Sequence, residues 1–140
     1  MRNFTTRMMI AAATVVVAAG VAQAQTMKAE IPFTFRAGDK VMAAGTYQVS
    51  DVRGQSGIPM FRIADAEARV AILLVPYAAA DAKKTWQEPV LAFECTDSRC
   101  ALVSVWTGYG TPAYAFRHPK IGKDEPSRIA TVVMRSGRAE

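Results

Sequence analysis

The stretch VLAFECTDSRCALVSVW, from Val90 to Trp106, decides the fold because it holds both cysteines of the chain between two apolar runs. The polar loop TDSR, Thr96–Arg99, separates two segments with a period of two. Alternate positions carry Leu91, Phe93 and Cys95 before the loop and Cys100, Leu102, Ser104 and Trp106 after it. A period of two indicates half-buried β-strands, and a short polar loop between them indicates a hairpin. In that hairpin Cys95 faces Cys100. Facing residues have Cβ atoms within about 5.5 Å, which suits a disulfide bond.

The predicted register continues beyond the cysteines. It pairs Phe93 with Leu102, and it pairs Leu91 with Ser104. By the same parity Trp106 falls on the face that carries Leu102 and the cysteines. The bridge would enclose a small loop, so its chain-entropy contribution is only about 2 kcal/mol. Its main effect would be to pin the register of the hairpin.

The alternatives for the two cysteines are a metal site, a redox pair and two separate thiols. Tetrahedral zinc needs four ligands, and His118 is the only histidine of the chain. A thioredoxin-type motif has two residues between its cysteines, whereas four separate Cys95 from Cys100. A disulfide is therefore predicted, and reduced, separately buried thiols remain the alternative.

The period of two recurs along the rest of the chain. The alternating segments are IPFTFR at 31–36, TYQVS at 46–50, PMFRIA at 59–64, AYAF at 113–116 and RIATVVM at 128–134. With the cysteine hairpin and the run ARVAILLVPY they make seven to eight short strands separated by turn signals such as Gly38-Asp39. This pattern predicts a single all-β sandwich or barrel of mostly antiparallel strands.

Two segments have a different pattern. ARVAILLVPY, at 68–77, is apolar on both faces, which predicts a central strand covered on both sides. AAADAKKTWQEP, at 78–89, has alanine and lysine but no apolar stripe. It is predicted to be a loop with one helical turn.

The N-terminus has the features of a secretory signal peptide. MRNFTTR carries two arginines and no acid, an uncharged apolar stretch follows, and Ala22 and Ala24 form an A-x-A cleavage site. We expect residues 1–24 to be cleaved, 25–135 to form a single β domain and 136–140 to form a flexible tail. An uncleaved membrane anchor is the alternative, but the apolar run is shorter than the roughly 20 residues that span a bilayer. The expected location is secreted or periplasmic, without a membrane span after cleavage.

The charge balance excludes one class of partner. Without the two leader arginines, 15 basic residues face 12 acidic residues. A nucleic-acid-binding domain has a denser basic surface than this. We therefore expect no nucleic-acid partner, and an envelope component or a small molecule remains possible.

The segment IPFTFRAGDKVMAAGTYQV, at 31–49, resembles the start of a group of short secreted bacterial proteins. That group opens with Pro-Phe-x-Phe-x-x-Gly and continues with Ala-Gly-x-Tyr-x-Val. Proline usually precedes the Ala-Gly of the group, and Ala43 stands there instead. The group has no established activity, so the resemblance implies a secreted β domain and brings no catalytic residues.

The residues that could support catalysis do not form a known motif. His118 lies between an arginine and a proline and is predicted to be an exposed surface histidine, with no nucleophile elbow elsewhere. Glu88, Glu94 and Asp97 could act as a carboxylate pair for hydrolysis, but no spacing joins them. The sequence therefore predicts no catalytic residue, no metal site and no cofactor.

Aromatic residues in the second half of the chain are the best material for a binding site. The candidates for ligand contact are Trp86, Trp106, Tyr109 and Tyr114, all in or beside loops. Core packing is the competing explanation, above all for Trp106. The leading hypothesis is an exported non-enzymatic β domain that binds a partner or serves as a structural component of the envelope. A carrier with an apolar barrel cavity is the first alternative, and a carboxylate-dependent hydrolase is the second.

Overall fold

The computed structural model describes residues 26–53, 57–97, 99–118 and 126–136. The predicted signal peptide and residues 137–140 lie outside these ranges. The predicted tail began at Ser136, but Ser136 is the last residue of a strand and pairs with Met27.

The all-β prediction is confirmed, because the described residues form eleven strands and no helix. The strands are β1 (Thr26–Ile31), β2 (Phe35–Ala37), β3 (Lys40–Met42), β4 (Gly45–Asp51), β5 (Phe61–Asp65), β6 (Ala71–Leu74), β7 (Ala78–Ala80), β8 (Val90–Cys95), β9 (Cys100–Trp106), β10 (Ala113–Ala115) and β11 (Arg128–Ser136). The number exceeds the predicted seven to eight partly because the run 31–36 is interrupted after Ile31, which separates β1 from β2. Two further short strands, β3 and β7, had no clear alternating pattern.

A bent hairpin at the start of the chain organises the sheet. β1 pairs with β4 and β2 pairs with β3, so residues 26–51 form one antiparallel ribbon. The ribbon bends between β1 and β2, where Pro32 has no N–H to donate to a neighbouring strand. After the bend, β2 pairs in parallel with the start of β9.

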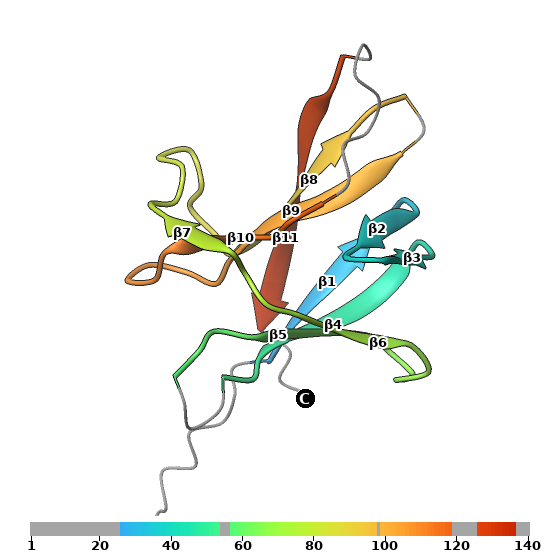
Figure 1. The fold of residues 1–140 in the computed structure, drawn as a ribbon, viewed down its shortest axis with the longest axis horizontal. Coiled ribbons are helices and arrows are strands. Elements are labelled where there is room, and N and C mark those ends of the chain that lie inside the picture. The colour runs from blue at the N-terminus through green and yellow to red at the C-terminus, as the bar shows by residue number, and fades with distance from the viewer. Residues whose placement is uncertain (1–25, 54–56, 98, 119–125, 137–140) are drawn as a thin grey trace, which may run out of the picture.

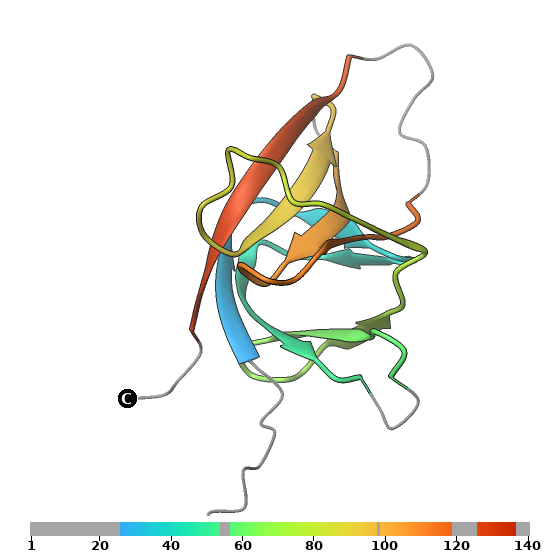
Figure 2. The same ribbon diagram turned by 90° about the vertical axis from the view of Figure 1, so that its left-hand side faces the viewer.

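The long strand β11 connects the two halves of the molecule. Residues 128–133 pair with β8, and residues 134–136 pair with β1. The strand order is β3-β2-β9-β8-β11-β1-β4-β5-β6; beside this path, β10 pairs with β9, and β7 pairs with β10. Because β2 continues from β1, the sheet curls back on itself into a nearly closed barrel (Figure 1; Figure 2). In Figure 1, β7–β10 lie in the upper layer and β4–β6 lie in the lower layer.

The interior is filled by side chains from both layers. Ring contacts cross it, with centroids 5.4 Å apart for Phe35 and Phe93 and 5.9 Å apart for Phe61 and Phe116. The largest fully buried side chains are Phe35, Phe61, Phe93, Ile31, Met42, Ile63, Leu91, Leu102, Met134, Val49, Val105 and Cys95. The predicted alternation therefore identified the buried residues Ile31, Phe35, Tyr47, Val49, Phe61 and Ile63 correctly. Phe33 is only partly buried, and most of β1 lies before the segments for which alternation was predicted.

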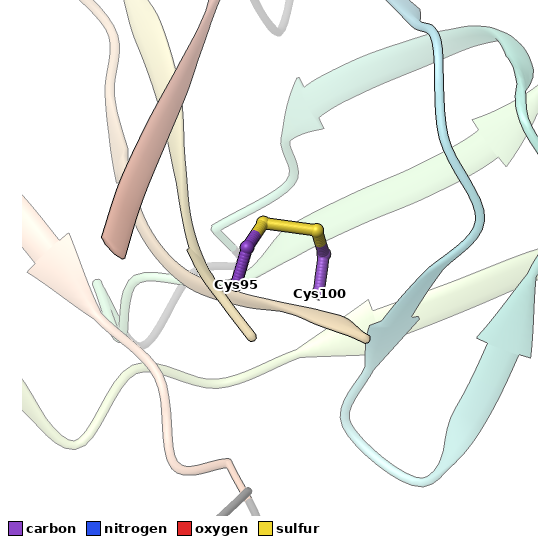
Figure 3. The surroundings of a disulfide bond; sticks show 2 residues. All are labelled: Cys95 and Cys100. Atoms are coloured by element: carbon purple, nitrogen blue, oxygen red, sulfur yellow. A yellow bond between two sulfur atoms is a disulfide. The ribbon is translucent and has the colours of Figure 1, made fainter. Parts of the chain in front are cut away.

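The predicted disulfide is confirmed. Cys95 ends β8, Cys100 begins β9, and their sulfurs are bonded across the hairpin with the Cα atoms 4.1 Å apart (Figure 3). Cys95 belongs to the main core, so the bridge closes one end of the buried interior.

The predicted register of this hairpin is right near the cysteines and wrong beyond them. Phe93 pairs with Leu102 as expected, but Ala92 pairs with Ser104, so Val103 has no partner on β8. This β-bulge adds one residue to β9 and reverses the parity of everything after it. Leu91 therefore faces Val105 instead of Ser104. The backbone N–H of Phe116 donates to the Val103 carbonyl at 2.9 Å.

The prediction of a central strand at 68–77 is wrong. β6 lies at the end of the strand order and pairs only with β5 among the described strands. Leu74 is buried, whereas Leu73 is 58% exposed and Val75 is 57% exposed. The residue pattern shows two apolar faces, but the fold covers only one of them.

The segment 78–89 was predicted to be a loop with one helical turn; residues 81–89 do form a loop, but no helical turn occurs in it. Its first residues form the short strand β7, which pairs with β10. The following loop contains a hydrogen-bonded turn in which Trp86 N donates to Lys83 O at 2.9 Å.

Candidate functional site

An aromatic cluster formed by Trp86, Trp106 and Tyr109 lies on the outer face of the upper layer. Trp106 ends β9, Trp86 comes from the loop before β8, and Tyr109 comes from the loop after β9. The bulge at Val103 puts Trp106 on this face, because without the extra residue the indole would follow Leu102 into the main core. The prediction that Trp106 shares a face with Leu102 and the cysteines is therefore wrong.

The ring of Trp106 packs against both of the other rings. The Trp86 and Trp106 ring centroids are 6.3 Å apart with an interplanar angle of 32°. Tyr109 meets Trp106 edge-on, with a centroid distance of 5.4 Å and an angle of 85°. Trp106 is 3% exposed and Tyr109 is 77% exposed, so one ring anchors the cluster and the other presents it to solvent.

Hydrogen bonds hold the loop that carries Tyr109. The indole Nε1 of Trp106 donates to the Thr111 carbonyl at 3.0 Å, and the Thr111 hydroxyl donates to the Gly108 carbonyl at 2.6 Å. Gly110 has φ of +85°, a conformation that favours glycine. The buried indole donor is thus satisfied, and the loop is fixed against the ring that it covers.

Two further features extend the cluster. The Lys83 ammonium lies 5.8 Å from the Trp86 ring centroid, within the range of a cation–π contact. On the other side, Val90 pairs with both Trp106 and Val133, so these three residues form one row across β9, β8 and β11. Val133 is 43% exposed. The surface therefore combines one cation, aromatic rings and an exposed aliphatic side chain.

Tyr114, the fourth predicted aromatic residue, is not part of this cluster. It packs in the main core, with its ring centroid 5.4 Å from that of Phe61. Its hydroxyl accepts a hydrogen bond from Arg53 Nη2 at 3.2 Å, and Arg53 also pairs with Asp51 at 2.9 Å. Hydrogen bonds with Asp51 and then with Tyr114 raise the pKa of the Arg53 guanidinium above its ordinary value, so it stays charged. This group connects the end of β4 to β10.

Of the residues considered for catalysis, Glu88 comes from the loop that carries Trp86, whereas Glu94, Asp97 and His118 come from other segments. His118 is half-buried, which corrects the expectation of an exposed histidine, and its Nε2 lies 3.5 Å from Glu94 Oε2. Glu88 and Asp97 are exposed in loops. Within the described ranges, no group of three or more His, Cys, Asp or Glu side chains is arranged to hold a metal ion.

Sequence reasoning did not identify Lys83 as a contact of Trp86, Arg53 as a contact of Tyr114, or Val133 as part of the row that contains Trp106. Lys83 could have been found, because it precedes Trp86 by three residues in the same loop. Val133 and Arg53 carry no local signal, since their contacts depend on strand pairing and on chain segments far apart in sequence.

Comparisons with family models, with curated proteins and with solved structures give no significant match to this chain. The described part of the chain contains no helix with the length and apolar character needed to cross a membrane.

Proposed function

We propose that the protein is an exported, non-enzymatic β domain that acts by binding, and that the aromatic cluster is its contact surface. One observation carries the proposal: Tyr109, 77% exposed, is held edge-on against the buried Trp106 instead of extending freely from its loop. A rigid aromatic residue on a fixed support loses little conformational entropy on binding, which favours its use as an anchor.

Export is part of the proposal and rests on two features. The first 24 residues have the composition of a signal peptide, and a disulfide persists in oxidising compartments.

The carrier and the hydrolase have weaker support. A carrier needs an apolar cavity of roughly 300 Å³ or more, whereas rings such as Phe35, Phe61 and Phe93 pack across the interior. A hydrolase of the two-carboxylate type needs a second carboxyl group within about 10 Å of the first across a cleft. Glu94, the least exposed of the three predicted carboxylates, has a histidine as its partner instead.

Intrinsic tryptophan fluorescence tests the proposal, because both tryptophans belong to the cluster. The protein is titrated with soluble cell-wall oligosaccharides, with a proline-rich peptide and with a fatty acid. A saturable change in emission with at least one probe is expected, and Tyr109→Ala and Trp86→Ala should each weaken it about tenfold or more.

Tyr77→Ala is the matched control, since Tyr77 is 59% exposed and stacks with Arg117 instead of the cluster. It should leave the affinity unchanged. Binding that survives both cluster variants would move the site elsewhere, and the absence of any saturable response would count against this surface. Mass spectrometry of the protein from its native extract would report the mature N-terminus and any retained small molecule.

A further inference from the structure

The edge strand β6 is the second unusual surface of the molecule. The eleven residues from Val70 to Ala80 contain no charged side chain. Natural proteins usually protect a free strand edge with charges, proline or a covering segment. Ala71–Leu74 contains no charged residue and no proline, and among the described residues no strand pairs with its open edge. Its sequence has the two apolar faces of a strand with neighbours.

The pairing of β6 with β5 shows which backbone groups are free. Asp65 N donates to Val70 O at 3.0 Å, and the register then pairs Ala64 with Ala71, Ile63 with Ile72 and Arg62 with Leu73. Hydrogen-bonded and non-hydrogen-bonded pairs alternate along an antiparallel ladder. Ile72 therefore bonds to β5, while the N–H and C=O groups of Ala71 and Leu73 point toward the open edge.

We propose that β6 pairs with β6 of a second copy of this chain, in an antiparallel arrangement about a two-fold axis. The occupant follows from the charge and the symmetry of the edge. In a two-fold pairing each side chain meets a copy of its own strand, so a charged edge would repel itself. The uncharged β6 does not, and pairing would bring the Leu73 side chains of the two copies onto the same face of a continuous sheet.

Other open edges in the described part of the chain suit this pairing less well. β3 carries Lys40 beside its exposed Val41, and the half of β11 that pairs only with β8 begins at Arg128. β7 is uncharged but offers only alanine methyl groups for burial. β6 alone among these combines an uncharged edge with a large exposed apolar side chain.

The proposed contact involves about four residues per copy, well below the roughly 800 Å² per partner that stable interfaces bury. A weak dimer is therefore expected, with a dissociation constant between roughly micromolar and millimolar. β6 lies in the lower layer and the aromatic cluster lies on the upper layer, so the two surfaces can be tested separately.

Sedimentation velocity over a protein concentration range of about 10 μM to 1 mM tests the proposal within that affinity range. The full chain is expressed, and the soluble form that accumulates is used after its N-terminus has been read by mass spectrometry. A monomer–dimer equilibrium is expected. Leu73→Lys should weaken it by at least about tenfold, because the introduced charges meet across the axis.

Two further variants distinguish an effect on the β6 edge from the effect of a charge placed elsewhere on the surface. Ala71→Pro removes a donor that points to the open edge and leaves the bonds to β5 in place, so it should also weaken the dimer. Ile58→Lys introduces the same charge at a side chain of similar exposure, 54% against 58% for Leu73, in the loop before β5. It should leave the equilibrium unchanged.

Hydrogen exchange provides a readout that needs no substitution. The amides of Ala71 and Leu73 should exchange more slowly at high protein concentration than at low, whereas the exchange rate of Ile72 should change little. A protein that stays monomeric up to about 1 mM would overturn the proposal. A dimer unaffected by both edge variants, or open-ended assembly in place of a closed dimer, would overturn it as well.

Discussion

At the scale of single residues, Ala68 has the least favourable backbone conformation for its type. Its φ of +56° lies in the left-handed region, and it is the only described residue other than glycine with positive φ. The turn between β5 and β6 imposes this conformation, because Ala68 N donates to Asp65 O at 2.8 Å and Asp65 Oδ1 accepts from Arg69 N at 2.6 Å. For L-residues with a Cβ this region costs about 1–2 kcal/mol.

Ala68→Gly is therefore expected to stabilise the protein by about 0.5–1 kcal/mol. The gain is the relief of strain less the extra entropy that glycine loses on folding. Urea denaturation measures the difference in the free energy of unfolding. Ala80→Gly, at an exposed strand position in β7, is the control and should destabilise by up to about 1 kcal/mol. A loss of stability in both variants would show that the turn does not strain Ala68.

Tyr47 links stability to alkaline pH. Its side chain is 4% exposed, and its hydroxyl donates to the Ala43 carbonyl at 2.5 Å. Burial, and secondly the negative charge of Asp65, raise the pKa of Tyr47 above its ordinary value of 10.0. Below pH 10 the phenol is neutral in both states. Above pH 10 the unfolded chain loses this proton first, so stability falls until the folded phenol also ionises.

We expect the free energy of unfolding to decrease above pH 10 by up to about 1.4 kcal/mol per pH unit from this residue. Tyr47→Phe should cost about 1 kcal/mol at neutral pH through the lost hydrogen bond, yet show a shallower alkaline decline. Urea denaturation between pH 8 and 11 compares the two proteins. Parallel alkaline declines would contradict this account of Tyr47.

At the scale of elements, a disulfide and a β-bulge together set the pairing register of the β8–β9 hairpin. The disulfide holds Cys95 opposite Cys100, while the bulge at Val103 shifts the other end of the hairpin by one residue. β8 also pairs with β11, which gives it neighbours on both sides. The hairpin should therefore keep its place when the bridge is removed.

The double variant Cys95→Ala/Cys100→Ala is expected to fold with a loss of about 2 kcal/mol, because the closed loop is short. Urea denaturation with and without reductant checks this: reductant should lower the midpoint of the native protein and leave that of the variant unchanged. Complete unfolding in reductant would mean that the bridge maintains the fold itself.

At the scale of the whole molecule, the turn between β2 and β3 lies against β6, so the two ends of the strand order approach each other. Gly38, in the turn between β2 and β3, has φ of +58°. A Cβ at this position would lie 3.1 Å from Leu74 Cδ2 and 3.3 Å from Ile72 Cδ1. β6 therefore approaches the turn of the first hairpin, although the two are far apart in the order of strands.

Gly38→Ala is expected to cost about 2–3 kcal/mol, from backbone strain and from displacement of the β6 side chains. Gly110→Ala is the matched control, since Gly110 has φ of +85° and open space around the added Cβ. It should cost only the strain, about 1–2 kcal/mol. Equal losses of stability in the two variants would show that the contact with β6 is easily relaxed.

The sequence by itself determined the local features of this protein: the strand alternation, the turn at Gly38-Asp39 and the Cys95–Cys100 bridge. Each depends on residues a few positions apart, and side-chain direction in a strand repeats every two residues. The inward positions of Ile31, Phe35, Tyr47, Val49, Phe61 and Ile63 could be predicted for that reason.

Only the tertiary structure decided which strands have neighbours and which face Trp106 occupies. Apolar residues on both faces of β6 could not show that it lies at an edge, because coverage is supplied by strands distant in sequence. The bulge at Val103 reverses the parity on which the Trp106 prediction depended, and the contact between Arg53 and Tyr114 joins segments 61 residues apart. The alternation of residues indicates to which face of its own strand a side chain points. Which residues cover that face depends on pairing between strands that are distant in the sequence.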